Sequence, residues 1–149
     1  MKKSVIYIGA DHAGFSLKEK IKKYLDKTGI AYVDLGGKGE AGDDYPDYAF
    51  RVAERVVRDK NSKGILICGT GTGMVIAANK IKGIRAAVAY DNYSAKMARE
   101  HNDANVLCLR GRKFSDEKNL KFVKIWLNTR FSGARRHNRR IKKIKKYER

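Results

Sequence analysis

Short apolar runs and helix-like segments alternate along the chain. Five apolar runs have the length of buried strands, and they cover residues 5–9, 31–35, 64–68, 84–89 and 104–109. Each run is followed by a segment whose apolar residues recur at helical spacing, namely 15–27, 46–57, 74–80, 92–100 and 115–128. This alternation predicts an α/β fold, a three-layer α/β/α sandwich around a five-stranded, parallel, Rossmann-like sheet.

A further helix, rich in Lys and Arg, is predicted for about 135–149. Ile141, Ile144 and Tyr147 form one stripe along it. An apolar stripe on an otherwise charged helix indicates packing against a partner, and a second copy of the chain is the simplest one. We therefore expect this extra helix to serve dimerisation, within one domain that spans 1–149.

The composition argues against a membrane or secreted protein. No apolar run approaches the ~20 residues that a membrane-spanning helix needs, and the amino terminus leads into a strand-like segment rather than a signal-peptide core. The two cysteines lie inside apolar runs, which is typical neither of a disulfide framework nor of a metal cluster. We expect no metal, no membrane partner and a reducing, cytoplasmic location.

The formal net charge of +18 is high for 149 residues. Ten Lys or Arg and a single acid lie between Arg130 and Arg149, so half of the excess belongs to the last twenty residues. Such a tail could hold nucleic acid through phosphate contacts. Without aromatic stacking residues or a known binding module, a solvated basic helix is favoured, and nucleic acid stays a minor alternative.

The segment Cys68-Gly69-Thr70-Gly71-Thr72-Gly73 is the strongest candidate site. It joins a buried strand to a helix start, and its glycines let a ligand approach the backbone while the first helical N–H groups point outward. Cys68 stands at the end of the strand, where the partial positive charge of a helix terminus favours a thiolate. The alternative is that Cys68 is a small hydrophobic core residue.

A nucleotide site is a second alternative. The dinucleotide fingerprint requires a third glycine where this chain has Met74, so the fingerprint fails. Asp91 does follow the glycine turn by about 20 residues, where an acid that binds ribose would stand. Nucleotide binding therefore rests on the glycine turn and this one acid.

The predicted topology separates the polar candidates into two groups. Asp11, His12, Cys68 and Asp91 follow strands, and ligands of such sheets bind at the carboxyl ends of the strands. His101 precedes the fifth strand, at the opposite edge. A second subunit is therefore needed to bring His101 to the site.

Several segments together resemble the ribose-5-phosphate isomerase B family, which also includes allose-6-phosphate and galactose-6-phosphate isomerases. They lie in order from the first strand to the last helix: Asp11–Phe15, Asp44–Tyr48, Gly64–Gly73, Ile76–Lys80, Gly83–Ala87, Arg99–Asn105 and Arg136–Arg140. The resemblance implies an aldose–ketose isomerase without cofactor, which interconverts ribose 5-phosphate and ribulose 5-phosphate through a cis-enediolate. It also implies a homodimer with shared active sites, and a tetramer made of two such dimers is the alternative.

The resemblance also implies a role for each residue of the site. Cys68 would be the base that moves the proton between C2 and C1, and His101, assisted by Asp11, would open the furanose ring. The remaining site residues would bind the substrate, with Thr70 also catalytic: Tyr45 and Asn102 at sugar hydroxyls, Gly69, Thr70, Gly71, Thr72 and Gly73 at the enediolate oxygen, and His12, Arg112, Arg136 and Arg140 at the phosphate.

The phosphate-binding arginines and the sugar are the least fixed parts of this interpretation. The chain has one residue more than family members usually have between Phe131 and the Arg-His pair. The Arg-His-x-x-Arg spacing selects Arg136 and Arg140, but Arg135 or Arg139 could share their role. A hexose 6-phosphate, allose or galactose, is the alternative substrate. Cys108 is assigned to the core and His137 to a structural role.

Overall fold

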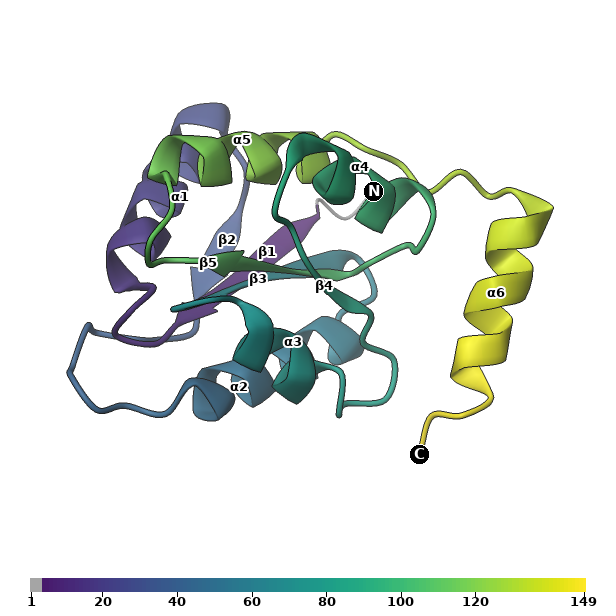
Figure 1. Ribbon diagram of the computed structural model, residues 1–149, viewed down its shortest axis with the longest axis horizontal. Coiled ribbons are helices and arrows are strands. Elements are labelled where there is room, and N and C mark those ends of the chain that lie inside the picture. Colours follow the sequence, from purple (N-terminus) through teal and green to yellow (C-terminus); the bar gives the residue numbers. More distant parts are fainter. Residues whose placement is uncertain (1–3) are drawn as a thin grey trace.

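A five-stranded parallel sheet lies at the centre of the structure, a computed structural model that describes residues 4–149 (Figure 1). The strand order is β2-β1-β3-β5-β4, and every neighbouring pair is parallel, as predicted. Residues 1–3, the start of the predicted domain, lie outside the described residues. The strands are β1 (Val5–Ala10), β2 (Tyr32–Asp34), β3 (Ser62–Cys68), β4 (Ala86–Val88) and β5 (Val106–Arg110).

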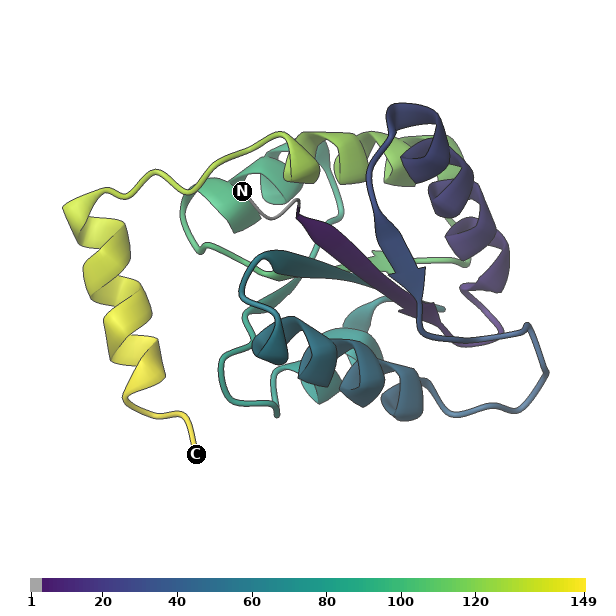
Figure 2. The ribbon, with the colours of Figure 1, turned by 180° about the vertical axis from the view of Figure 1, so that it is seen from behind.

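Helices cover both faces of the sheet, which confirms the predicted three layers (Figures 1 and 2). On one face lie α1 (Phe15–Thr28), α4 (Asn92–Glu100) and α5 (Asp116–Leu127), and on the other lie α2 (Tyr45–Arg58) and α3 (Thr72–Ala78). A sixth helix, α6 (Arg135–Lys145), stands beside these layers. Within residues 4–149, no helix has the length and apolar character needed to cross a bilayer.

The two faces of the sheet bury two separate apolar clusters. Along β1, Ile6 and Ile8 point toward α1, α4 and α5, whereas Tyr7 points toward α2 and α3, because successive side chains of a strand alternate between faces. Cys68 and Cys108 both belong to the second cluster. Cys108 is fully buried, so its assignment to the core is confirmed, and burial raises the pKa of its thiol.

Some helix and strand boundaries differ from the predicted ones because of local backbone conformation and side-chain hydrogen bonds. The helix after the glycine turn begins at Thr72 instead of Met74, because Gly71 adopts a left-handed conformation and its carbonyl accepts a bond from the N–H of Val75. β4 is shorter than predicted, since the N–H groups of Arg85 and Ala86 donate to the amide oxygens of Asn105 and Asn79 instead of a strand.

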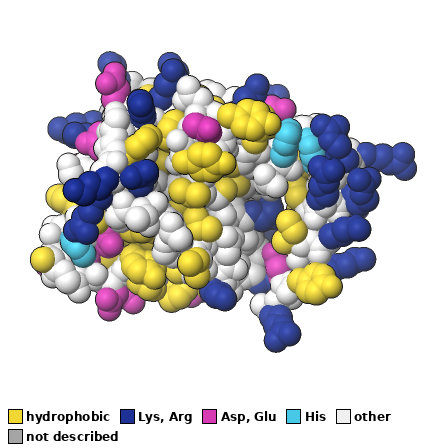
Figure 3. All heavy atoms as spheres, in the orientation of Figure 1, with side chains coloured by type: hydrophobic (Ala, Val, Ile, Leu, Met, Phe, Trp, Pro, Cys, Tyr) yellow, Lys and Arg dark blue, Asp and Glu magenta, His cyan; other side chains and the backbone are white. Residues whose placement is uncertain are grey.

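The basic helix α6 differs from its prediction at its end. It finishes at Lys145, so Tyr147 lies beyond it and is 90% exposed, and the predicted helix to residue 149 is wrong. Ile141 is buried, but Ile144 is 53% exposed, so the apolar stripe is only partly covered within one chain. Lys and Arg side chains gather over this helix (Figure 3).

A buried lysine fixes the loop that follows β2. Lys18, on α1, is 1% exposed, and its Nζ donates to both carboxylate oxygens of Asp34 at 2.9 Å. The same Nζ donates to the carbonyls of Gly36 and Gly37 at 3.2 and 2.7 Å. A buried charge is stable only when it is paired and hydrogen-bonded, and here all of its partners belong to one short segment. Lys18 therefore ties α1 to the start of the loop 36–44.

Replacing Lys18 by methionine should destabilise the protein by about 3 kcal/mol, because the buried carbonyl of Gly37 loses its donor and Asp34 loses one of its two lysine partners. Lys20→Met is the matched control on the same helix. Lys20 pairs with Asp116 at 2.6 Å, but its side chain is half exposed, so its loss should cost under ~1 kcal/mol. Urea unfolding measures both free energies. Equal losses for the two variants would contradict the structural role of Lys18.

Candidate active site

Backbone hydrogen bonds bring three turns together at the carboxyl ends of β1, β3 and β5. The N–H of Asp11, just after β1, donates to the carbonyl of Ile67 in β3 at 3.2 Å. The N–H groups of Gly111 and Arg112, after β5, donate to the carbonyls of Cys68 and Gly69 at 2.8 and 3.2 Å. The chain segments carrying Asp11, Cys68 and Arg112 are therefore side by side, as the predicted parallel sheet requires.

Cys68 lies at the base of this group of turns. It ends β3, is 4% exposed, is not in a disulfide, and its Sγ accepts a hydrogen bond from the N–H of Gly71 at 3.2 Å. Within residues 4–149, the N–H groups of Gly69, Thr70 and Gly73 donate to no acceptor. Unpaired N–H groups beside a thiol can bind negative charge that develops on an oxygen next to it.

Tyr45 and Arg112 flank the glycine turn. A Cβ on Gly73 would lie 2.6 Å from the ring of Tyr45, and one on Gly69 would lie 3.7 Å from Cδ of Arg112. The tyrosine therefore packs directly against the backbone of Gly73, where a larger residue would collide with it. The structure brings both predicted side chains to the turn that carries Cys68.

Asp11 is buried beside the same turn. Its Oδ1 accepts hydrogen bonds from the N–H groups of Ala13 and Gly14 at 3.0 and 3.2 Å. Burial raises the pKa of the Asp11 carboxyl above its ordinary value and outweighs these bonds and the nearby His12, which lower it. A buried acid with a raised pKa is suited to exchange a proton with a ligand.

Asp43 is a member of this site that the sequence did not single out. Its Oδ1 lies 2.6 Å from Nδ1 of His12 and accepts the backbone N–H of His12 at 2.9 Å, and its Oδ2 accepts the hydroxyl of Tyr48 at 3.0 Å. These contacts fix the orientation of the His12 ring. Burial by itself would raise the pKa of Asp43, but the hydrogen bonds from His12 and Tyr48 hold it below its ordinary value.

Asp11, His12 and Asp43 also have the spacing of a cation site, because their ligand atoms lie within 4.8 Å of one another. Three of the four carboxylate oxygens already accept hydrogen bonds, however. Asp43 uses both oxygens on His12 and Tyr48, and Asp11 uses Oδ1 on two backbone N–H groups. The trio is therefore better described as a hydrogen-bonded network than as a set of free metal ligands.

The other predicted residues lie at the opposite edge of the sheet. His101 follows the last turn of α4, and its ring lies 4.2 Å from that of the buried His137, whose Nδ1 is 2.6 Å from the hydroxyl of Ser132. Arg136 and Arg140 lie on α6, next to His137 in sequence. Burial first, and then nearby positive charge, hold the pKa of His137 below its ordinary value. Asn102 adjoins His101, so one chain does not unite the two groups.

Asp91, the acid behind the nucleotide alternative, is a helix cap. Its carboxylate accepts the N–H of Ser94 at 2.6 Å, and the hydroxyl of Ser94 accepts the N–H of Asp91 in return. This reciprocal capping box satisfies the first turn of α4. The structure thus gives Asp91 a structural role.

Known proteins match this chain over nearly its whole length. The family described as Ribose/Galactose Isomerase matches residues 6–144. A Bacillus subtilis protein assigned as a sugar phosphate isomerase is 49% identical over 144 residues, 96% of each chain. Ribose-5-phosphate isomerase B of Mycobacterium tuberculosis is 42% identical over 145 residues, 97% of this chain and 90% of that one. The crystal structure of ribose-5-phosphate isomerase B from Mycoplasma genitalium with bound ribulose 5-phosphate has a TM-score of 0.94 and 45% identity, covering 99% of this chain and 97% of that one.

Asp43→Asn should lower the free energy of unfolding at pH 7 by about 1 to 2 kcal/mol, because charge-assisted hydrogen bonds are lost. A carboxyl whose pKa is lower in the folded protein stabilises it fully above its unfolded pKa of about 3.9, and this contribution is lost as pH falls through the folded value. The difference between wild type and variant should therefore shrink below pH 4. Urea unfolding from pH 7 to pH 3 measures it, and a difference that stays constant over this range would exclude the ionised carboxylate as its source.

Proposed function

Because the chain belongs to the ribose/galactose isomerase family, we propose that it interconverts ribose 5-phosphate and ribulose 5-phosphate through a cis-enediolate. The observation that carries the proposal is the buried Cys68 thiol beneath a glycine turn in which the N–H groups of Gly69, Thr70 and Gly73 are unpaired within the described chain. Support also comes from the relative that has ribulose 5-phosphate bound. The chemistry assigned below uses side chains and backbone groups alone, without a cofactor.

The proton transfer is assigned to Cys68. Its thiolate takes the proton from C2 of the open-chain aldose and returns it to C1 of the cis-enediolate, while the hydroxyl proton on O2 passes to O1, which gives the ketose. Negative charge develops on the carbonyl oxygen meanwhile, and the N–H groups of Gly69, Thr70 and Gly73 stabilise it. Each such donor is worth about 3 kcal/mol in the transition state. The side chain of Thr70 and the backbone of Gly71 and Thr72 complete the turn around this oxygen.

Ring opening must come first, because the sugar phosphate is mainly a closed furanose. We propose that His101 of the partner subunit, assisted by Asp11, donates the proton to the ring oxygen. Burial raises the pKa of the Asp11 carboxyl above its ordinary value, which suits it to exchange a proton in this step. Tyr45, against Gly73, and Asn102 of the partner subunit bind the sugar hydroxyls.

The phosphate is assigned to cations from both subunits. His12 and Arg112 stand beside the glycine turn, and Asp43 fixes the direction of the His12 ring. Arg136 and Arg140 of the partner subunit would close the site from the other side, with Arg135 or Arg139 as possible substitutes. Guanidinium groups bind phosphate through two parallel hydrogen bonds, which positions the substrate as well as holding it.

A two-fold dimer follows from the placement of the two residue groups. One edge of the sheet carries Cys68 and the other carries His101, so two copies related by a two-fold axis complete two equal sites. Exposed large apolar side chains are available for such an interface: Ile76 on α3, Tyr93 on α4 and Ile144 on α6. The helix α6 lies beside the layers of its own chain, a position that suits a helix that packs against a neighbouring subunit.

The first test is an isomerase assay with ribose 5-phosphate in the presence of EDTA, beside allose 6-phosphate and galactose 6-phosphate. We expect turnover without metal and a preference for the pentose. Turnover of a hexose phosphate alone would keep the site and change the substrate. No turnover of any of the three would contradict the proposal.

The shared site has its own test, in which two inactive variants are mixed. Cys68→Ser and His101→Asn should each lower turnover by about 10³-fold, since each removes a proton-transfer group. Unfolded together and refolded, they should regain about a quarter of wild-type activity, because half of the dimers are hybrids with one intact site. Cys108→Ala, a thiol removed from the core, should keep its turnover. No recovery in a mixture that contains hybrid dimers would contradict the shared site.

A further inference from the structure

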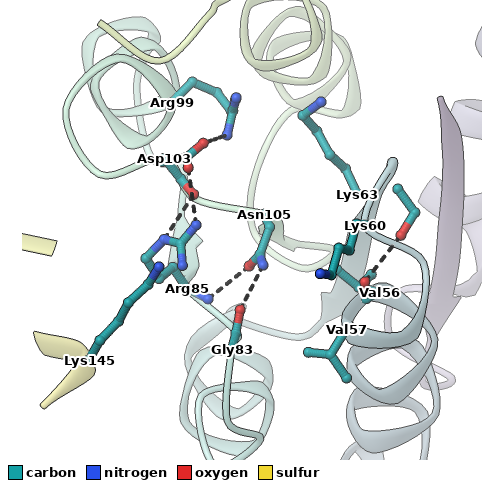
Figure 4. A pocket seen from close by; sticks show the side chains of 11 residues that line it. Val56, Val57, Lys60, Lys63, Gly83, Arg85, Arg99, Asp103, Asn105 and Lys145 are labelled. Atoms are coloured by element: carbon teal, nitrogen blue, oxygen red, sulfur yellow. Dashed lines mark hydrogen bonds and ion pairs between the residues drawn. The ribbon is translucent and has the colours of Figure 1, made fainter. Parts of the chain in front are cut away.

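A cavity of about 540 Å³ lies at the amino-terminal edge of the sheet (Figure 4), whereas Cys68 ends β3 at the opposite edge. Its lining comes from the end of α2, the start of β3, the segment before β4, the end of α4 and α6. Among residues 4–149, one carboxylate lines it, that of Asp103. The cationic side chains in the lining outnumber it, and they are Lys60, Lys63, Arg85, Arg99 and Lys145.

Two arginines form a fixed wall of the cavity. Arg85 donates to Oδ2 of Asp103 at 3.2 Å, and Arg99 donates to Oδ1 of the same carboxylate at 2.9 Å. The Arg99 side chain is 9% exposed and also donates to the carbonyl of Ala104 at 2.9 Å. Asn105 accepts the N–H of Arg85 and donates to the carbonyl of Gly83, so the backbone beneath is held too. This wall keeps its shape before any ligand arrives.

The three lysines have no such partner. Figure 4 shows all three around the cavity. In the part of the chain that the structure describes, Nζ of Lys60, Lys63 and Lys145 makes no hydrogen bond or ion pair. Lys63 is half-buried, and burial together with the charge of Arg99 holds its pKa below the ordinary value of a lysine. A lysine that water solvates freely would keep the ordinary pKa of a lysine. Lys60 and Lys145 are exposed to solvent, so the positive charge that an anion would relieve most is that of Lys63 beside Arg99.

The excess charge indicates which anion fits. Five cationic groups against one carboxylate leave four positive charges, which exceeds what a single phosphate dianion needs and matches a di- or triphosphate group. The volume is within the range of about 300–1,000 Å³ that small-molecule sites occupy. Val56 and Val57 supply an apolar wall at one side, against which an organic part of the ligand could pack.

We propose that this cavity binds a small molecule through a di- or triphosphate group. None of the residues assigned to the sugar phosphate lines it, so the proposal is independent of the isomerase assignment. The cavity recognises the phosphate group, which could belong to an inorganic polyphosphate or to a nucleotide. The two sources are separated by the experiment.

The experiment is calorimetric titration of the full-length protein with orthophosphate, pyrophosphate and tripolyphosphate at 150 mM salt. We expect affinity to rise with the charge of the anion. Lys63→Met combined with Lys145→Met should weaken tripolyphosphate binding at least tenfold, while the aliphatic stems are kept. The matched control is Lys121→Met with Lys124→Met, which removes the same charge from α5.

The control and a site variant decide between this cavity and other cationic surfaces. If the two double variants weaken tripolyphosphate binding equally, the binding is general charge attraction and the proposal is overturned. Loss of binding in Arg112→Gln would place the anion in the sugar-phosphate site instead, and it would overturn the proposal too. Absence of saturable binding for all three anions has the same consequence.

Adenosine triphosphate, titrated in parallel, separates the two sources of the phosphate group. Tighter binding than tripolyphosphate, lost in the cavity variant, assigns the organic part to the wall of Val56 and Val57. Equal affinities assign recognition to the phosphates alone. Both results support the cavity as a polyphosphate site.

Discussion

Close backbone contact between the turns after β1, β3 and β5 is the constraint on which the site depends. A Cβ on Gly14 would lie 2.5 Å from the carbonyl of Ile67, so only glycine lets the start of α1 approach β3 this closely. The N–H of Gly111 reaches the carbonyl of Cys68 from the other side. With both neighbours this near, Cys68 is buried yet remains at the base of a turn with free N–H groups, which a ligand can reach.

Buried charge gives the loop 36–44 its place beside that turn. Lys18 holds the loop at its start through Asp34 and two carbonyls, and Asp43 holds it near its end through His12. Relative to an apolar pair in the same place, neither interaction adds much stability, because each charge is first taken from water, although removing one partner of either pair is costly. These interactions instead favour one position of the loop, since any other position would leave a charge without its partner, which is costly.

The two edges of the sheet carry different parts of the chemistry. At the carboxyl edge lie a thiol, a buried acid and unpaired N–H groups, which suit proton transfer. At the amino edge lie His101, the arginines of α6 and the cationic cavity. The high net charge is therefore partly organised: α6 and the cavity concentrate it where anions are expected, while many other lysines lie on solvated helix faces.

The sequence by itself determined the order and type of every strand and helix, because apolar periodicity and the glycine turn are local signals. It also determined that Asp11, His12, Cys68 and Asp91 share an edge, since parallel topology sends the ends of these strands to one side. The role of Asp43 and the burial of Lys18 were decided only by the tertiary structure. They depend on which distant groups meet: Asp43 lies 31 residues from His12, and no local pattern encodes such a contact. The helix α6 was predicted from its local pattern, but its end at Lys145 and its place beside the layers were visible only in the structure.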